Sequence, residues 1–310
     1  MMCRMSRARL AVVLMVVLAG CGAQAGPPLA APTPSRLPRA ATSHVVVVVM
    51  ENKERDDALA PSSAPYLSGL ARRSGSMTAS FGVRHPSLPN YLALISGSTQ
   101  GVTDDCTDCQ GHGPTLADQL ERAGRTWKAY MEGLPAPCSA DVAGHRGYAK
   151  KHNPFAYFPA ITRDRRRCRR IVGFDALAAD LKAGRLPDFS FVSPDLCNDT
   201  HDCDVGQGDR FLRATLPRLI RELGPHGFLV LTYDEGRSDA GCCAGQASGG
   251  RIATVVAGPD VRPGARSATP VDHYGVLRTI EDAFRVGHLG HAGDRRNGSL
   301  RPLFRVAPRV

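Results

Sequence analysis

From residue 44 onward, apolar residues gather in short runs separated by polar segments. The first run, Val45 to Val49, is continuous and β-branched, which predicts a strand buried on both faces of a parallel sheet. The runs Phe189 to Val192, Phe228 to Thr232 and Ile252 to Ala257 predict further buried strands.

Between these runs the apolar positions recur at helical spacing. The segment from Gln207 to Leu223 shows it best, with Leu212, Leu216 and Leu219 on one face and Pro217 as a possible kink. Strands that alternate with helices predict an α/β fold, a mostly parallel sheet with helices on both faces. The expected helices cover residues 66–73, 89–95, 115–123, 207–223 and 274–284.

The first twenty residues have the pattern of an export signal. Three arginines lie within the first nine positions, an apolar run covers Leu10 to Leu18, and Leu18-Ala19-Gly20-Cys21 follows. The run is shorter than the ~20 residues that a membrane-spanning helix needs. We expect residues 1–20 to be a lipoprotein signal peptide that leaves Cys21 lipidated. A plain secretory signal that is cut elsewhere is the alternative.

The segment that follows, residues 21–43, is rich in Pro and Ala and has no acidic residue. This composition is typical of a flexible tether. Residues 44–310 are expected to form one domain. It would lie outside the cytoplasm, either lipid-anchored to the cell membrane or secreted.

The chain is basic, with 39 Lys and Arg against 29 Asp and Glu and a formal net charge of +10. Removal of the signal leaves 36 basic and 29 acidic residues, a net charge of +7. Such a surface attracts nucleic acid, anionic lipid or phosphorylated substrates. The sequence contains no zinc finger, no helix-turn-helix signature and no interleaved aromatics, so we expect no nucleic-acid partner.

Much of the basic charge falls in one stretch of arginines. This stretch is either a solvated loop or a contact for anionic headgroups. Its members are Arg163, Arg165, Arg166, Arg167, Arg169 and Arg170.

Cysteine usage agrees with export. Apart from Cys3 and Cys21, eight cysteines remain, an even number that permits up to four disulfides of unknown pairing. Zinc is the rival interpretation because Cys106 and Cys109 form a CxxC, but no second CxxC follows. The other six are Cys138, Cys168, Cys197, Cys203, Cys242 and Cys243.

Polar residues follow three of the predicted strands. Glu51-Asn52 ends the first, residues 198–202 (Asn-Asp-Thr-His-Asp) lie beyond the strand at 189–192, and Asp234-Glu235 ends the strand at 228–232. In open α/β sheets, ligands bind beyond the carboxyl ends of the strands. Carboxylate and amide oxygens suit a hard cation. Acidic residues that only cap turns are the competing explanation for each cluster.

A second feature is the stretch from His85 to Tyr91. Because Pro89 opens the next helix, Ser87 should lie at the helix N-terminus, where free N–H groups and the helix dipole favour an anion. Ser87 is either a helix cap or a hydroxyl that a nearby cation activates for attack on phosphorus. In the second case Asn90 would hold a non-bridging phosphate oxygen.

Together these segments resemble the bacterial phosphoesterase family that contains secreted acid phosphatases and phospholipases C. The likeness runs in order through Glu51-Asn52, residues 85–94, residues 198–209, and Thr232 to Glu235, and continues with Asp272 to Leu277. It is greatest to small secreted acid phosphatases that act on phosphoinositides. The resemblance implies an alkaline-phosphatase-like fold.

The resemblance also implies roles for particular residues. Ser87 would be the nucleophile that forms a phosphoserine, and His201 would donate a proton or stabilise charge. Glu51, Asn52, Asp234 and Glu235 would surround a metal. Lys151, His152, Asp199 and His273 would contact substrate, and His85 would be structural.

Ser87-Leu88-Pro89-Asn90 is followed by Tyr91, so the sulfatase motif, which needs arginine there, is not matched. We expect a phosphoric monoester hydrolase, an acid phosphatase acting on phosphoinositides or nucleotides. A phospholipase C-type phosphodiesterase acting on phospholipids is the alternative. The cation could be Mg²⁺, Ca²⁺, Mn²⁺, Zn²⁺ or iron.

Overall fold

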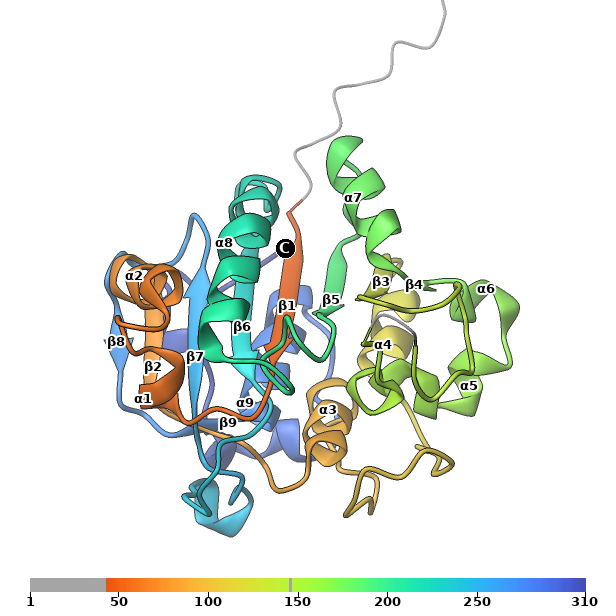
Figure 1. Ribbon diagram of the computed structural model, residues 1–310, viewed down its shortest axis with the longest axis horizontal. Helices are drawn as coiled ribbons and strands as arrows, with labels where there is room; N and C mark the ends of the chain where they lie inside the picture. The colour runs from red at the N-terminus through yellow and green to blue at the C-terminus, as the bar shows by residue number, and fades with distance from the viewer. Residues whose placement is uncertain (1–42, 145–146) are drawn as a thin grey trace, which may run out of the picture. The chain divides into compact units, whose positions relative to one another are not determined.

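The structure, a computed structural model, describes residues 43–144 and 147–310. Its centre is one sheet with the strand order β4-β3-β5-β1-β6-β7-β2-β8, and β9 pairs with β2 (Figure 1). The strands are β1 Val45–Met50, β2 Gly75–Phe81, β3 Trp127–Met131, β4 Ile171–Val172, β5 Phe189–Ser193, β6 Phe228–Tyr233, β7 Arg251–Ala257, β8 Arg266–Ser267 and β9 Val271–Asp272.

The middle of the sheet is parallel, as the valine run predicts. Strand β1 lies between β5 and β6, with Val47 opposite Phe191 on one side and Val230 on the other. Strand β7 is the exception, because it runs antiparallel to both β6 and β2. The predicted fold class, a mostly parallel sheet in an α/β protein, is therefore confirmed.

Alternation along β1 sends its side chains to two separate cores. Val45, Val47 and Val49 pack with helices α3, α4 and α9, whereas Val46 and Val48 pack with α2, α7 and α8. Figure 1 shows α2 and α8 in front of the sheet and α9 behind it. The longer helices are α2 Pro65–Arg73, α3 Ser87–Ser96, α4 Leu116–Arg122, α7 Phe174–Lys182, α8 Val205–Arg221 and α9 His273–Phe284.

The expected helices and strands agree with the structure to within a few residues. Strands β2 and β3 and helix α7 were not predicted. Strand β2 reads Gly-Ser-Met-Thr-Ala-Ser-Phe, and such small polar residues give no strand signal. Pro217 lies inside α8 without ending it. Residues 138–170 contain only helices of three or four residues, among them α5 Pro159–Thr162 and α6 Arg165–Cys168.

All eight cysteines of the domain are paired. The disulfides are Cys106–Cys109, Cys138–Cys168, Cys197–Cys203 and Cys242–Cys243. Cys106 and Cys109 are thus bonded to each other in a disulfide, as the disulfide interpretation predicted, and are not zinc ligands.

The predicted signal peptide (residues 1–20), Cys21 and nearly all of the tether lie outside the described residues. Between residues 43 and 310, apart from the two positions left out, no helix is both long and apolar enough to cross a bilayer.

Candidate active site

The ends of β1 and β6 meet the start of helix α3. The hydroxyl of Ser87, the first residue of α3, donates to Glu51 Oε2 at 3.0 Å and lies 3.5 Å from Glu235 Oε1. Asn52 N donates to Asp234 Oδ1 at 3.0 Å. Residues that lie far apart in the sequence thus form one cluster at the carboxyl edge of the sheet, as the strand-end argument requires.

Two hydrogen bonds made by residues of α3 hold the start of this helix, and Ser87 with it, in place. Tyr91 lies one turn further along the same face and donates to Glu51 Oε1 at 2.5 Å. The backbone N–H of Leu88 donates to Asp105 Oδ1 at 3.0 Å. A side-chain carboxylate therefore accepts from the N-terminus of α3, at the position that the sequence argument reserved for an anion.

The structure gives Asn90 other partners than the predicted phosphate oxygen. Its Oδ1 accepts from Val83 N at 2.7 Å and Arg84 N at 3.2 Å, and its Nδ2 donates to Arg84 O at 2.6 Å and Pro86 O at 3.2 Å. These bonds use both ends of the amide. Asn90 shapes the loop before Ser87, and the predicted direct contact with phosphate is not supported.

Buried carboxylates dominate the cluster. Glu51, Asp199 and Asp234 have no exposed surface, and Glu235 is 6% exposed. Burial, together with the charges of Asp234 and Asp199, raises the pKa of Glu51. Burial also raises the pKa of Asp234. Burial likewise raises the pKa of Asp199 and of Glu235 to about 8.

His152 lies inside the carboxylate cluster. Its Nε2 is 3.3 Å from Glu51 Oε1, its Nδ1 is 3.1 Å from Asp199 Oδ2, and its ring stacks on Tyr91. Burial lowers the pKa of His152 to about 3. His152 is 2% exposed, Asp199 is fully buried and Ser87 is 1% exposed; the predicted substrate contact of His152 and Asp199 stays a prediction.

His201 lies at the rim of the cluster on the loop between β5 and α8. Its backbone N–H donates to Asp199 Oδ1 at 2.7 Å, and its Nδ1 pairs with Asp202 Oδ1 at 2.6 Å. This leaves Nε2 facing Lys151 Nζ at 3.1 Å. Lys151 also donates to Asp105 Oδ2 at 2.8 Å, so a cation and a histidine stand side by side at the rim.

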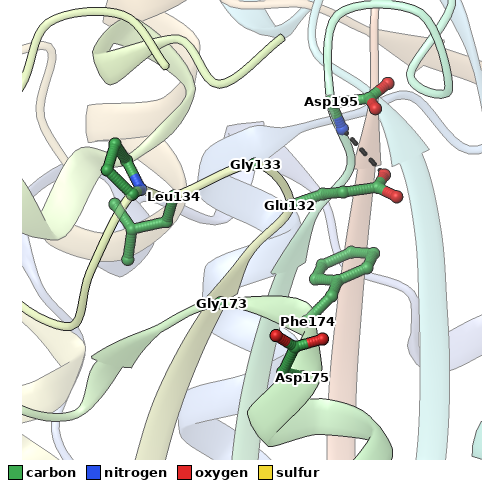
Figure 2. Close-up of a pocket in the computed structure, with 8 residues that line it drawn as sticks. Glu132, Gly133, Leu134, Gly173, Phe174, Asp175 and Asp195 are labelled. Atoms are coloured by element: carbon green, nitrogen blue, oxygen red, sulfur yellow. Dashed lines mark hydrogen bonds between the residues drawn. The ribbon is translucent and has the colours of Figure 1, made fainter. Parts of the chain in front are cut away.

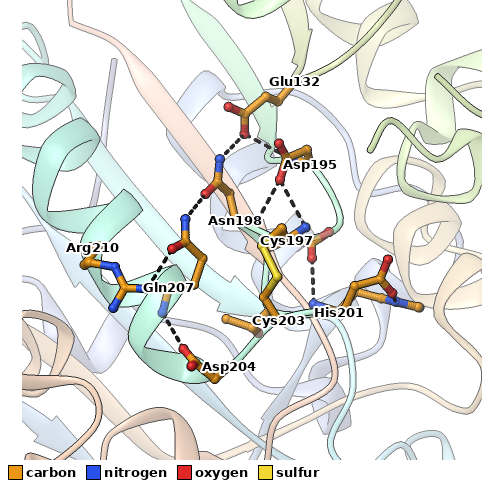
Figure 3. Close-up of a disulfide and its surroundings, with 12 residues drawn as sticks. Glu132, Asp195, Cys197, Asn198, His201, Cys203, Asp204, Gln207 and Arg210 are labelled. Atoms are coloured by element: carbon orange, nitrogen blue, oxygen red, sulfur yellow. Dashed lines mark hydrogen bonds and ion pairs between the residues drawn. A yellow bond between two sulfur atoms is a disulfide. The ribbon is translucent and has the colours of Figure 1, made fainter. Parts of the chain in front are cut away.

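The loop that carries His201 is fixed by a chain of side-chain bonds (Figure 3). Asn198 donates to Glu132 Oε2 at 3.0 Å and accepts from Gln207 Nε2 at 2.7 Å, and the Cys197–Cys203 disulfide closes the loop. Thr200 Oγ1 donates to Glu51 O at 2.7 Å. His201 is thereby held to the end of β1 and to α8.

Two other histidines have structural partners. His273 is fully buried and its Nε2 bonds to the backbone oxygen of Asp234 at 2.5 Å, so the predicted substrate contact is not supported. His85 Nδ1 bonds to Glu235 Oε2 at 2.5 Å and its Nε2 to Ser238 O at 3.1 Å. His85 orients the Glu235 carboxylate, which agrees with its structural assignment.

The residues of the cluster fit a divalent cation. Asp199 Oδ2, Asp234 Oδ2 and His152 Nε2 are buried and have no hydrogen-bond partner within the described residues. Unpartnered buried polar atoms are costly, and a cation would satisfy them and balance the carboxylate charge. Glu51, His152 and His201 also bring ligand atoms within 4.8 Å of one another, but the Lys151 ammonium beside His201 would repel a cation held there.

A separate pocket of about 570 Å³ opens beyond the ends of β3 and β5 (Figure 2). Three carboxylates line it, from Glu132, Asp175 and Asp195. Glu132 Oε2 accepts from Asp195 N at 3.0 Å. None of the residues that line this pocket is Ser87 or a direct partner of Ser87, so the pocket is distinct from the Ser87 cluster.

The sequence reasoning missed three residues of the site. Tyr91 carries a usable signal, because its helical spacing from Ser87 places both on one face. Asp202 follows His201 directly, but adjacency does not predict an ion pair. Asp105 reaches Leu88 and Lys151 from a loop near the Cys106–Cys109 disulfide, and nothing in its sequence context indicates this.

The fold is alkaline-phosphatase-like. A solved protein of the alkaline phosphatase superfamily from Vibrio parahaemolyticus superimposes with a TM-score of 0.52 over 77% of this chain and 66% of its own, at 13% identity. That likeness concerns the fold alone.

The sequence model of the Phosphoesterase family matches residues 57–287. A phosphatidylinositol-3-phosphatase of Mycobacterium tuberculosis is 36% identical over 81% of this chain and 79% of its own length. An acid phosphatase of Aspergillus fumigatus is 28% identical over 78% of this chain but only 55% of its own length. The chain belongs to the Phosphoesterase family, and it is an enzyme of the phosphoric monoester hydrolase class.

Proposed function

We propose that the chain is an exported acid phosphatase that cleaves phosphate monoesters through a phosphoserine at Ser87. The observation that carries the proposal is the Ser87 hydroxyl, which lies 3.0 Å from Glu51 and 3.5 Å from Glu235 at a helix start. Phosphoinositides are the proposed substrate class, with nucleotides as the second choice. The M. tuberculosis relative, whose name specifies a phosphoinositide substrate, supports this choice.

In the first half-reaction, Ser87 Oγ bonds to phosphorus and the bond from phosphorus to the leaving oxygen breaks. The serine proton passes to Glu51 Oε2, its hydrogen-bond partner. In the second half-reaction, water attacks the phosphoserine, and phosphate leaves as Ser87 regains a proton.

The leaving oxygen needs a proton, and His201 is the proposed donor. Asp202 holds Nδ1, so Nε2 is the nitrogen that would face the leaving group. Lys151 lies 3.1 Å from that nitrogen, and its ammonium can donate only to an unprotonated Nε2. For His201 to act as the proton donor, Lys151 would turn from Nε2 to the phosphate charge when substrate binds. A divalent cation held by Glu51, Asn52, Asp234 and Glu235 would supply further stabilisation of the negative charge on the transferring group.

The nucleophile is tested with p-nitrophenyl phosphate and the variant Ser87→Ala. We expect turnover to fall by at least about 10³-fold, because the covalent route is lost. Ser62→Ala, a change at an exposed serine, is the matched control. The phosphorylcholine ester of p-nitrophenol serves as the diester probe, and preferential cleavage of it would replace the monoesterase with a phosphodiesterase.

The general acid is tested by changing the leaving group. His201→Gln should lower kcat/KM by roughly 10²–10⁴-fold for an alkyl phosphate and much less for p-nitrophenyl phosphate, whose leaving group needs no proton. His226→Gln, at an exposed histidine, is the control. Equal losses on both substrates would remove His201 as proton donor.

The proposed location rests on Cys21 and the signal before it. A radiolabelled fatty acid supplied to expressing cells should enter the protein and be absent from the Cys21→Ser variant. Equal labelling of both would place the acyl chain elsewhere. Secretion of unlabelled protein would favour the plain secretory signal.

A further inference from the structure

The arginine stretch at residues 163–170 divides into two groups in the structure. Arg167 pairs with Asp118 at 2.9 Å and with Glu121 at 3.1 Å. Arg170 pairs with Glu121 at 3.1 Å and lies over the ring of Trp127 at 5.5 Å. These two arginines hold the segment of residues 138–170 to α4 and β3.

The other four arginines have no such partners. Each is exposed, and within the described part of the chain none has a carboxylate oxygen within 4.0 Å or a side-chain hydrogen bond. Asp164, the acid among them, caps α6 by accepting from Arg166 N at 2.8 Å. The free-arginine patch consists of Arg163, Arg165, Arg166 and Arg169.

The patch has a fixed place at one edge of the sheet. The backbone oxygen of Arg170 accepts from Ala129 N on β3, and Figure 1 shows α6 beyond β4. Cys168 of α6 is bonded to Cys138, at the start of the loop that carries Val142. Val142 is 53% exposed and is one of two large hydrophobic residues so exposed among those described.

We propose that the free-arginine patch is a docking surface for anionic phospholipid membranes. Four unpaired guanidinium groups complement a layer of phosphate headgroups, with about 1 kcal/mol per charge near such a surface, and Val142 adds an apolar contact. The same stretch, residues 138–170, also contributes Lys151 and His152 to the site.

A nucleic acid is the poorer partner. The aromatic residues of this stretch, Tyr148, Phe155, Tyr157 and Phe158, are all buried, so none of their rings is exposed for base stacking. Helices α5 and α6 have four residues each, too few to lie along a groove.

The test measures binding of the full chain to phosphatidylcholine vesicles with and without phosphatidylglycerol, by sedimentation. All proteins carry Cys21→Ser, so that an acyl chain cannot contribute. The patch variant has Gln at its four positions. The matched control removes the same charge from exposed positions around α7 and α8: Arg185, Arg213, Arg218 and Arg221.

We expect the parent to bind phosphatidylglycerol vesicles and the patch variant to bind at least about 100-fold more weakly, since each charge contributes roughly fivefold. The control variant should keep most of the binding. Hydrolysis of p-nitrophenyl phosphate, a soluble substrate, should be unchanged in both variants, which also shows that they fold.

Three outcomes would overturn the proposal. One is a parent that does not distinguish anionic from neutral vesicles. Another is a control that loses as much as the patch variant, which would assign binding to net charge alone. The third is tighter binding to single-stranded RNA than to vesicles with the same arginine dependence. None of them depends on the identity of the phosphatase substrate.

Discussion

Two clusters of carboxylates lie at the carboxyl ends of strands, and they differ in how their oxygens are used. In the Ser87 cluster, Asp234 Oδ2 is buried without a hydrogen-bond partner among the described residues. In the acidic pocket, Asp195 Oδ1 accepts from Asn198 N at 2.7 Å, and Glu132 Oε2 accepts from Asp195 N. Hydrogen bonds to backbone N–H groups explain the placement of Asp195 and Glu132 in this pocket.

This difference shows which acidic residues at the ends of strands are candidates for catalysis or cation binding. A carboxylate that accepts backbone N–H groups at the surface stabilises a turn and needs nothing more. A buried carboxylate that accepts no hydrogen bond is destabilising, because it has lost its hydration without gaining a partner. It therefore favours binding a cation, a proton or a substrate. Asp→Asn substitutions, which keep the side-chain size and remove the charge, test this difference between the two clusters.

The largest contrast is expected between Asp234→Asn and Asp195→Asn. Each removes one negative charge. Asp234→Asn should lower kcat/KM on p-nitrophenyl phosphate by about 10²–10³-fold or more, because it removes preorganised charge from the site. Asp195→Asn retains an acceptor oxygen and should change kcat/KM by less than about threefold, equivalent to ~0.5 kcal/mol. Equal effects would abolish the distinction.

Cation binding should separate the clusters by stability as well as by rate. Mg²⁺, Ca²⁺, Mn²⁺, Zn²⁺ and Fe²⁺ are each added to chelated protein, and the thermal midpoint is recorded. The effective ion should stabilise the fold by about 2.7 kcal/mol at 100 times its Kd. The increase in midpoint should vanish in Asp234→Asn and remain in Asp195→Asn. An unchanged increase in both variants would place the ion elsewhere.

A buried acid outside both clusters provides a smaller test. Glu281 on α9 accepts from Leu289 N through Oε1, while its Oε2 lacks a partner among the described residues. Burial raises the pKa of Glu281 to about 8, above the usual value of roughly 4.3 in the unfolded chain. The folded state therefore holds a proton that the unfolded state releases, and stability falls as the pH rises between these values.

Glu281→Gln should remove this dependence. Relative to the parent, the variant should gain up to about 5 kcal/mol in free energy of unfolding as the pH is raised from acid to about 8, because the two pKa values differ by nearly four units at ~1.4 kcal/mol each. Denaturant unfolding at several pH values measures the difference. A parallel pH dependence in parent and variant would show that Glu281 does not titrate in this way.

Much of the fold could be predicted from local pattern. The valine run of β1 and the apolar face of α8 indicate their elements because burial in this fold follows periods that the sequence displays. Strand β2 could not be predicted, since its small polar residues are buried only by neighbours distant in the sequence. The antiparallel strand β7 has the same kind of apolar run as a parallel strand, so the sequence did not indicate the direction in which this strand runs.

The candidate site could be predicted in part. Glu51, Asp234 and Ser87 meet because strand ends share an edge, a rule that needs no coordinates. The partners of Asn90, His152 and Asp199 could not be deduced, because the sequence does not reveal whether a polar side chain faces substrate or the loop beneath it. Family resemblance suggested these residues without separating the two cases.

The most direct measurement of the central claim is a rapid acid quench during turnover of a substrate with a radiolabelled phosphate group. The account predicts that the label is trapped covalently and that peptide mass spectrometry places it on Ser87. Label at another residue, or full turnover by Ser87→Ala without any trapped label, would contradict it.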